Sequence, residues 1–194
     1  MKIGTRISPD WLDRPDDLKF LKQIGVDCVD ITFDIFPGCK QTGGRLNREG
    51  VEQVVETLHR AGLPIERANS LNAYTKATFL DEPGSGKEID NLVHNAEICG
   101  AFNLPVMGVQ CFQAGQFGKF NVETHRRVEG RGGYQHLKMD LSEALDQSPP
   151  PGAPTHEEVW ERTLKIFRAV VPAAESAGVK IAMHGNDPPV PSIF

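Results

Sequence analysis

Apolar residues recur along this chain in a pattern that appears four times. A stretch with apolar residues at helical spacing ends at a glycine followed by an apolar residue, and a short, mostly apolar run comes next. Glycine adopts the left-handed backbone conformation that closes a helix without a Cβ clash, so each repeat predicts a helix and then a strand. The closing glycines are Gly25, Gly62, Gly100 and Gly178. The expected strands are 2–7, at the start of the chain, and then 28–33, 64–69, 106–111 and 180–184.

Residues that favour helix starts precede the same four helical stretches. Proline suits the first turn, asparagine caps an N-terminus, and Ser or Thr followed three residues later by Glu forms a capping box. The predicted starts are Pro15, Asn47, Ser85 with Glu88, and Thr155 with Glu158. We therefore predict four helices, each with an apolar face available for burial.

Strict alternation of strands and helices predicts an α/β fold with parallel strands and right-handed crossovers. No GxGxxG sequence follows the first strand, so we expect no nucleotide cofactor. A parallel (β/α)8 TIM barrel takes about 250 residues. We predict a single partial TIM-barrel domain over 1–194, an incomplete barrel of about five strands and four helices. The long glycine- and proline-rich insertion at 112–154, after strand four, is predicted to be a lid or a partner-contacting arm.

Composition narrows the cellular setting. The net charge of −5, with acidic and basic residues interspersed, disfavours a nucleic-acid partner. No apolar run approaches the roughly 20 residues that span a membrane, and the start of the chain lacks the apolar region of a signal peptide. The four cysteines form no CxxC pair, which favours reduced thiols. We expect a cytoplasmic protein without a membrane partner.

Side chains at the predicted strand ends are the candidates for chemistry, because barrel enzymes build their sites at the carboxyl ends of the strands. They combine one base, carboxylates, amides and an imidazole, a mixture that suits a sugar or polyhydroxy acid and a divalent metal. The candidates are Arg6, Asp34, Asn69, Gln110, His184, Asn186 and Asp187.

His184 carries the most weight among these candidates. It ends the last strand and is followed by Asn186, Asp187 and two prolines. Neutral imidazole binds Mn, Fe, Co or Zn, and a nearby carboxylate such as Asp187 can orient its second nitrogen. The alternatives are a histidine that bonds local backbone groups and an aspartate that forms a turn before proline.

Two further residues can each be interpreted as functional or as purely structural. Arg131 lies between glycines in the insertion, where a guanidinium could grip a carboxylate at two points, or could be a solvated loop arginine. Cys111 ends a strand and could be a reactive thiol, although a buried small apolar residue is the better interpretation.

Three stretches resemble the mannonate dehydratase family, a member of the xylose-isomerase-like group of sugar isomerases and epimerases. They are the opening from Arg6 to Gly25, the helix from Ile89 to Gly100, and Met183 to Pro189. The third is similar to the family's His-Pro-Asp-Asp-Pro-Pro loop. Here Gly185 stands in place of the proline and Asn186 in place of the first acid.

The resemblance implies an enzyme that dehydrates D-mannonate, or a related sugar acid, to 2-keto-3-deoxy-D-gluconate in hexuronate catabolism. It implies Mn²⁺, or an Fe²⁺ or Co²⁺ type of metal, and a homo-oligomer, a dimer. It assigns His184 as a metal ligand and places Asp187 at the second acid of the loop, so we expect Asp187, with Asn186 beside it in the sequence, to be catalytic. From their positions at strand ends and in the insertion, we expect Arg6, Arg131, Asn69 and Gln110 to bind the substrate.

The family's other metal ligands come from later strands, so we expect this chain alone to be weakly active or inactive. Two alternatives stay open. One is a metal-dependent sugar isomerase or epimerase on the same scaffold. The other is a non-catalytic half-barrel fragment.

Overall fold

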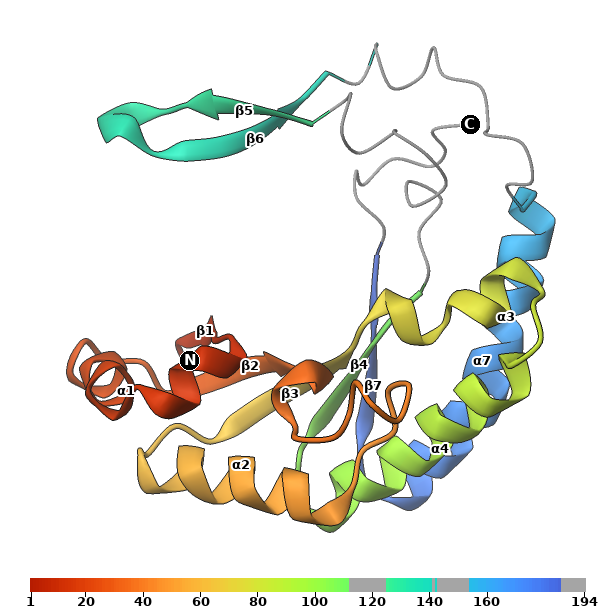
Figure 1. Ribbon diagram of the computed structural model, residues 1–194, viewed down its shortest axis with the longest axis horizontal. Helices are drawn as coiled ribbons and strands as arrows, with labels where there is room; N and C mark the ends of the chain where they lie inside the picture. The colour runs from red at the N-terminus through yellow and green to blue at the C-terminus, as the bar shows by residue number, and fades with distance from the viewer. Residues whose placement is uncertain (112–124, 141, 143–153, 186–194) are drawn as a thin grey trace.

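A parallel sheet with helices on one side forms the body of the molecule (Figure 1). The computed structural model describes residues 1–111, 125–140, 142 and 154–185. The sheet order is β1-β2-β3-β4-β7, and each neighbouring pair is parallel. Its strands are β1 (Gly4–Arg6), β2 (Cys28–Thr32), β3 (Ile65–Ser70), β4 (Val106–Gln110) and β7 (Lys180–His184). The predicted partial TIM-barrel architecture, five strands of parallel α/β structure, is confirmed.

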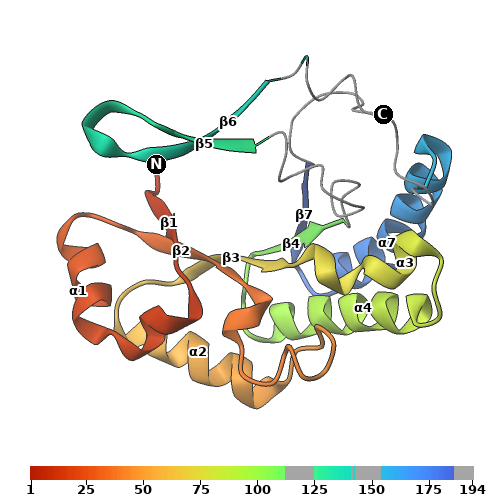
Figure 2. The ribbon, with the colours of Figure 1, turned by 45° about the horizontal axis from the view of Figure 1, so that its top comes forward.

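Helices connect successive strands and lie on the outer side of the curved sheet (Figure 2). The α-helices are α1 (Pro15–Gln23), α2 (Arg48–Arg60), α3 (Lys76–Leu80), α4 (Ser85–Ala101) and α7 (His156–Ser176). Short 3-10 helices η1 (Pro9–Asp13), η2 (Phe33–Ile35) and η3 (Asn72–Tyr74) follow the first three strands. Among the described residues, no helix has the length and apolarity needed to cross a membrane.

The core lies between the sheet and these helices. Strand residues that point outward are fully buried, for example Val29, Ile31 and Met107, and they meet apolar helix residues such as Val54 and Ile166. The opposite, concave face of the sheet carries the less buried strand residues, so polar side chains on this face stay accessible to a ligand.

The repeated helix ending is confirmed at three of its four positions. Gly25, Gly62 and Gly178 all have positive φ angles between 72° and 91°. After each of them an apolar residue donates its backbone N–H to the fifth residue before it, as Leu63 does to Leu58 at 2.9 Å. This bond satisfies a carbonyl that the helix end would otherwise leave unpaired.

The third repeat ends differently from the prediction. The helix runs through Gly100, and Asn103 takes the left-handed conformation with φ 55°, while Leu104 donates to Cys99 at 2.9 Å. Gly100 serves another purpose. A Cβ at this position would lie 2.5 Å from the carbonyl oxygen of Ala177, so glycine lets the end of α7 approach α4 closely.

Two of the predicted caps are confirmed and one is wrong. Asn47 accepts a hydrogen bond from Gly50 N at 2.7 Å, and the capping box of Thr155 with Glu158 is complete. The predicted box of Ser85 with Glu88 does not form. Glu88 instead accepts bonds from the backbone N–H groups of Ala77 and Thr78 at 2.9 and 2.8 Å, so its carboxylate caps the neighbouring helix α3.

The insertion contains a β-hairpin that the sequence pattern did not predict. Strands β5 (His125–Glu129) and β6 (Gln135–Met139) pair antiparallel around the turn η5 (Arg131–Gly133). The ribbon shows the hairpin standing apart from the helices and the main sheet (Figure 1). The role of the insertion as a lid or arm stays a prediction.

Candidate active site on the concave face

Predicted site residues from four strands share the concave face of the sheet. Arg6 ends β1, Asn69 lies near the end of β3, and Gln110 and His184 end β4 and β7. The register pairs Asn69 with Gly108, and Gln110 with His184. Since strand residues alternate between faces, these pairings place the side chains on one face at the carboxyl end of the sheet.

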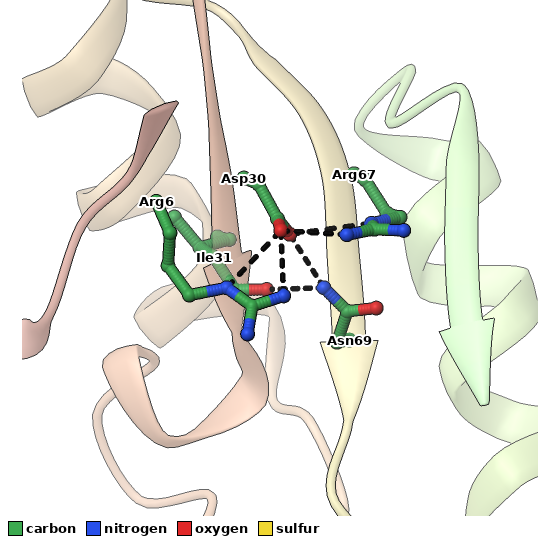
Figure 3. Close-up of polar contacts among 5 residues, drawn as sticks. All are labelled: Arg6, Asp30, Ile31, Arg67 and Asn69. Atoms are coloured by element: carbon green, nitrogen blue, oxygen red, sulfur yellow. Dashed lines mark hydrogen bonds and ion pairs between the residues drawn. The ribbon is translucent and has the colours of Figure 1, made fainter. Parts of the chain in front are cut away.

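Asp30, in the middle of β2, is the centre of the polar network on this face (Figure 3). Its carboxylate accepts hydrogen bonds from Arg6 Nη2 at 2.6 Å and from Arg67 Nη2 at 2.7 Å. It also accepts a bond from Asn69 Nδ2. One carboxylate therefore joins side chains from β1, β2 and β3.

The environment of Asp30 favours its ionised form. Burial by itself would raise the pKa of this carboxyl, because it removes water from the charged form. The hydrogen bonds and charges of Arg67 and Arg6 outweigh burial, so the pKa of Asp30 lies below its usual value. The same bonds raise the pKa of Arg67. At neutral pH the cluster thus holds two guanidinium groups around one carboxylate.

A β-bulge explains how Arg67 reaches this face. Val29 pairs with Ile65, but Asp30 pairs with Arg67, so Glu66 is an extra residue in β3. Ile65 is buried toward the helices, and without the bulge Arg67 would point the same way. With it, Glu66 and Arg67 both line the hollow on the concave face.

That hollow has a volume of about 390 Å³, and the positive and negative charges that line it balance. Its lining includes Arg6, Asp30, Glu66 and Arg67. The hollow lies toward the amino-terminal ends of the strands, where Gly4, Cys28 and Val106 also line it. Glu66 is already paired with Lys2 at 2.7 Å, so the two arginines share Asp30 as their acidic partner. The half-exposed guanidinium of Arg6 is the group here that can pair with an anionic ligand.

Asn69 lies two residues nearer the carboxyl end of β3 than Arg67, and its side chain is held tightly. Its side chain is buried, and Nδ2 donates to Asp30 and, at 3.2 Å, to the carbonyl of Ile31. The neighbouring strand β4 has a glycine, Gly108, beside it. A Cβ on Gly108 would lie 1.8 Å from Asn69 Oδ1, a distance no real Cβ contact shows, so only glycine fits beside this amide.

His184 and Gln110 form the outermost layer of the site. The imidazole Nδ1 of His184 lies 2.5 Å from the carbonyl oxygen of Gly185. A carbonyl only accepts, so Nδ1 carries the proton in the neutral ring and Nε2 keeps its lone pair. That tautomer is the one suited to binding a metal or accepting a hydrogen bond through Nε2.

The remaining predicted site residues are not brought to this face by the described structure. Arg131 lies at the exposed tip of the hairpin, at the start of η5. Asn186 and Asp187 lie outside the described residues. Within the ranges that the structure does describe, no three His, Cys, Asp or Glu side chains converge as a metal site would require.

A second polar cluster follows β2 and β3 at the same end of the sheet. The hydroxyl of Tyr74 donates to Asp34, and Lys40 Nζ lies 3.4 Å from the other Asp34 oxygen. Burial and this bond raise the pKa of Tyr74, and burial raises the pKa of Cys39 to about 11. Both groups therefore stay protonated at neutral pH, which fits a role in fixing the loop that follows η2.

Cys111 fits the interpretation as a buried small apolar residue. The residue is buried, and burial raises the pKa of its thiol to about 11. A thiol with that pKa is protonated at neutral pH and is a poor nucleophile.

Comparison with known proteins places this geometry in a fold. No protein-family model matches the chain. The mannonate dehydratase from Streptococcus suis serotype 2 superposes on 97% of the chain with a TM-score of 0.70 and 20% identity. The chain folds as part of a TIM barrel.

Two other solved structures support the same barrel. D-psicose 3-epimerase from Clostridium cellulolyticum H10 matches 94% of the chain with a TM-score of 0.53 and 12% identity. A putative xylose isomerase from Rhodospirillum rubrum matches 92% with a TM-score of 0.52 and 17% identity. The chain spans 53%, 52% and 52% of the lengths of these three proteins, about half of each TIM barrel.

Sequence reasoning missed two residues of the site, Asp30 and Arg67. A signal for Asp30 was present, because an acid in the middle of the apolar strand Cys28–Thr32 needs a partner. A signal for Arg67 was also present, because it lies two residues before the predicted site residue Asn69 and shares its face. Alternation counted from Ile65 gives the opposite face, because the bulge at Glu66 shifts the pattern.

Proposed function

We propose that this chain forms the amino-terminal part of a metal-dependent sugar-acid dehydratase that converts D-mannonate, or a close relative, to 2-keto-3-deoxy-D-gluconate. The observation that carries the proposal is the shared concave face of Arg6, Asn69, Gln110 and His184, one residue from each of four parallel strands. The likeness to a mannonate dehydratase over nearly the whole chain supports the choice of reaction.

The exposed guanidinium of Arg6 on this face favours an acid over a neutral sugar as substrate. Arg6 and Arg67 share one carboxylate, and the side chain of Arg6 is 53% exposed. In the proposed reaction Arg6 holds the substrate carboxylate, while Asn69 and Gln110 bind hydroxyl groups. Arg131 would add a second guanidinium from the hairpin.

Metal binding in the proposal rests on His184. A solved relative, a xylose-isomerase-like protein from Mycobacterium smegmatis with a TM-score of 0.50, is a complex with magnesium. One imidazole does not build a three-ligand centre, so the described residues by themselves do not form the metal site. We propose Mn²⁺ or a similar divalent ion, with His184 Nε2 as one ligand among several, and Asn186 and Asp187 as catalytic residues next to it.

Manganese titration of a complete barrel that contains this chain tests the ligand assignment. We expect His184→Ala to weaken Mn²⁺ affinity by at least about tenfold, measured by calorimetry, because a ligand is lost. His59→Ala is the matched control, since His59 is exposed on α2, on the helical side of the sheet. Equal affinity in the wild type and His184→Ala would remove His184 from the metal site.

A turnover assay on a complete barrel that contains this chain tests the reaction and separates it from its rival. The rival is a sugar isomerase or epimerase, which the likeness to D-psicose 3-epimerase and to a putative xylose isomerase favours. With Mn²⁺ present, loss of D-mannonate with formation of a 2-keto-3-deoxy acid supports the dehydratase. Interconversion of ketoses, with no change in the sugar acid, would support the isomerase or epimerase. No turnover of either substrate class would leave the non-catalytic half-barrel.

A further inference from the structure

We propose that Asp30 is a positioning residue that makes Asn69 a hydrogen-bond acceptor for a substrate hydroxyl, next to an anion-binding edge of Arg6. The inference rests on the proposed function, since it specifies the substrate class of the same site. It assigns to the concave face a preference for a hydroxylated carboxylic acid over either a plain carboxylic acid or a neutral polyol.

The hydrogen bonds of Asn69 fix which way its amide faces. Its two partners are a carboxylate oxygen of Asp30 and the carbonyl oxygen of Ile31, and both groups only accept at neutral pH. The nitrogen must therefore face them, and the oxygen must face the other way. The reverse orientation would set three acceptor oxygens against one another.

The oxygen of Asn69 then faces the lumen above β4. A Cβ on Gly108 would lie 1.8 Å from Oδ1, so the oxygen takes the space above β4 that a side chain at this position would fill. No hydrogen bond to Oδ1 occurs within the described part of the chain. This acceptor has no protein partner among the described residues and solvent can reach it, so a donor from a ligand can bond to it, and a sugar hydroxyl is such a donor.

Asp30 also sets the orientation of Arg6. It accepts from Nε and Nη2 of the guanidinium, at 3.1 and 2.6 Å. The third nitrogen points away from Asp30, toward the carboxyl end of β3 where Asn69 lies (Figure 3). A carboxylate bound at this edge of Arg6 and a hydroxyl bound at Asn69 would belong to neighbouring parts of one ligand.

A purely electrostatic role for Asp30 predicts the opposite effect of its removal. Without this carboxylate, Arg6 and Arg67 would attract any anion more strongly. Without its positioning effect, Asn69 would be free to turn its amide, and the preference for hydroxyl groups would fall. The selectivity between two acids therefore separates positioning from charge.

The test measures the binding of D-gluconate and of hexanoate to the chain by NMR titration. We expect the wild type to prefer gluconate by about tenfold, roughly the effect of one additional hydrogen bond. In Asp30→Asn the preference should fall below about threefold while hexanoate binds as well as before or better. Glu66→Gln is the matched control, because it removes an equal charge from the same hollow and should keep the preference.

Several results overturn the inference. They are an unchanged preference in Asp30→Asn, an equal loss in Glu66→Gln, or a wild type that does not distinguish the two acids.

A second measurement uses the wild type alone, so a folding defect of the variants cannot affect it. Gluconate should shift the ¹³Cγ resonance of Asn69 and leave its amide protons bonded to Asp30, and a shift of those protons alone would refute an acceptor role. Turnover and manganese binding enter none of these readouts, so the proposed function can fail separately.

Discussion

At the scale of one residue, the carboxylate of Asp30 both stabilises the fold and orients the side chains proposed to bind the ligand. Its bonds to Arg6 and Arg67 join β1, β2 and β3 on the concave face. A surface ion pair contributes little, but this carboxylate is only 21% exposed and receives bonds from two guanidinium groups. Its loss should therefore be measurable in the free energy of unfolding.

We expect Asp30→Asn to lower the free energy of unfolding at pH 7 by about 2 kcal/mol, the range for hydrogen bonds to charged groups. The folded pKa of Asp30 is lowered, so its stabilising contribution is complete above the unfolded pKa of about 3.9. The contribution disappears as pH falls through the lower, folded pKa. Urea unfolding at pH 7 and at successively lower pH checks this, and a difference between the proteins that grows on acidification would contradict it.

Residue patterns predicted the common face of Arg6, Asn69, Gln110 and His184, because that face follows from strand ends in a parallel sheet. They did not predict what joins these residues. The link depends on a bulge at Glu66, and an extra residue in one strand is visible only against its partner strand.

At the scale of elements, the short helix α3 is held by two side chains from other helices. Glu88 of α4 accepts the N–H groups of Ala77 and Thr78 at its start. Arg162 of α7 donates to the carbonyl of Phe79 near its end. A helix of five residues is not stable alone, so these charged caps and its packing must hold it in place.

Glu88→Ala should therefore loosen α3 before the rest of the fold. Its loss leaves two backbone N–H groups without a partner, at a cost of about 1–2 kcal/mol. We expect faster hydrogen exchange at Ala77 and Thr78 and little change in β2 and β3. Asp90→Ala, on an exposed position of the same helix, is the control. Equal exchange rates at Ala77 in the wild type and Glu88→Ala would contradict the capping role.

The ends of helices were predicted correctly where a nearby residue alone determines them, as the closing glycines Gly25, Gly62 and Gly178 do. The prediction was wrong where a residue had a stronger partner elsewhere. Gly100 is required by the approach of α7, and Glu88 is bound to α3, so neither acts at its own helix end as the pattern implied. The β5–β6 hairpin was missed because the glycine-rich sequence around Arg131 was interpreted as a loop.

For the whole molecule, the alternation of elements was enough to predict the fold class. Parallel strands with helical connections have few possible arrangements, and the lack of a dinucleotide-binding glycine motif favoured the barrel. The superposition on about half of a mannonate dehydratase agrees with the predicted five-stranded portion. The chemistry that such a barrel carries out depends on individual side chains, which the alternation of elements does not specify.

The order of the strands has a consequence for how the protein is made. Each strand of the main sheet lies beside the one synthesised before it, so the sheet can grow at one edge during translation. The addition of β7 is delayed, because roughly 70 residues separate it from β4. At about 5–20 residues per second, the edge of β4 waits several seconds for its neighbour.

Ribosome-bound chains offer a check. Chains stalled after β4 has emerged should already protect β2 and β3 from protease, and β4 should gain protection only after β7 emerges. Protection of all strands in a single step at β7 would contradict growth in order. Until that moment the nascent chain exposes the backbone of β4, which makes it the point where a chaperone or a neighbouring chain can bind first.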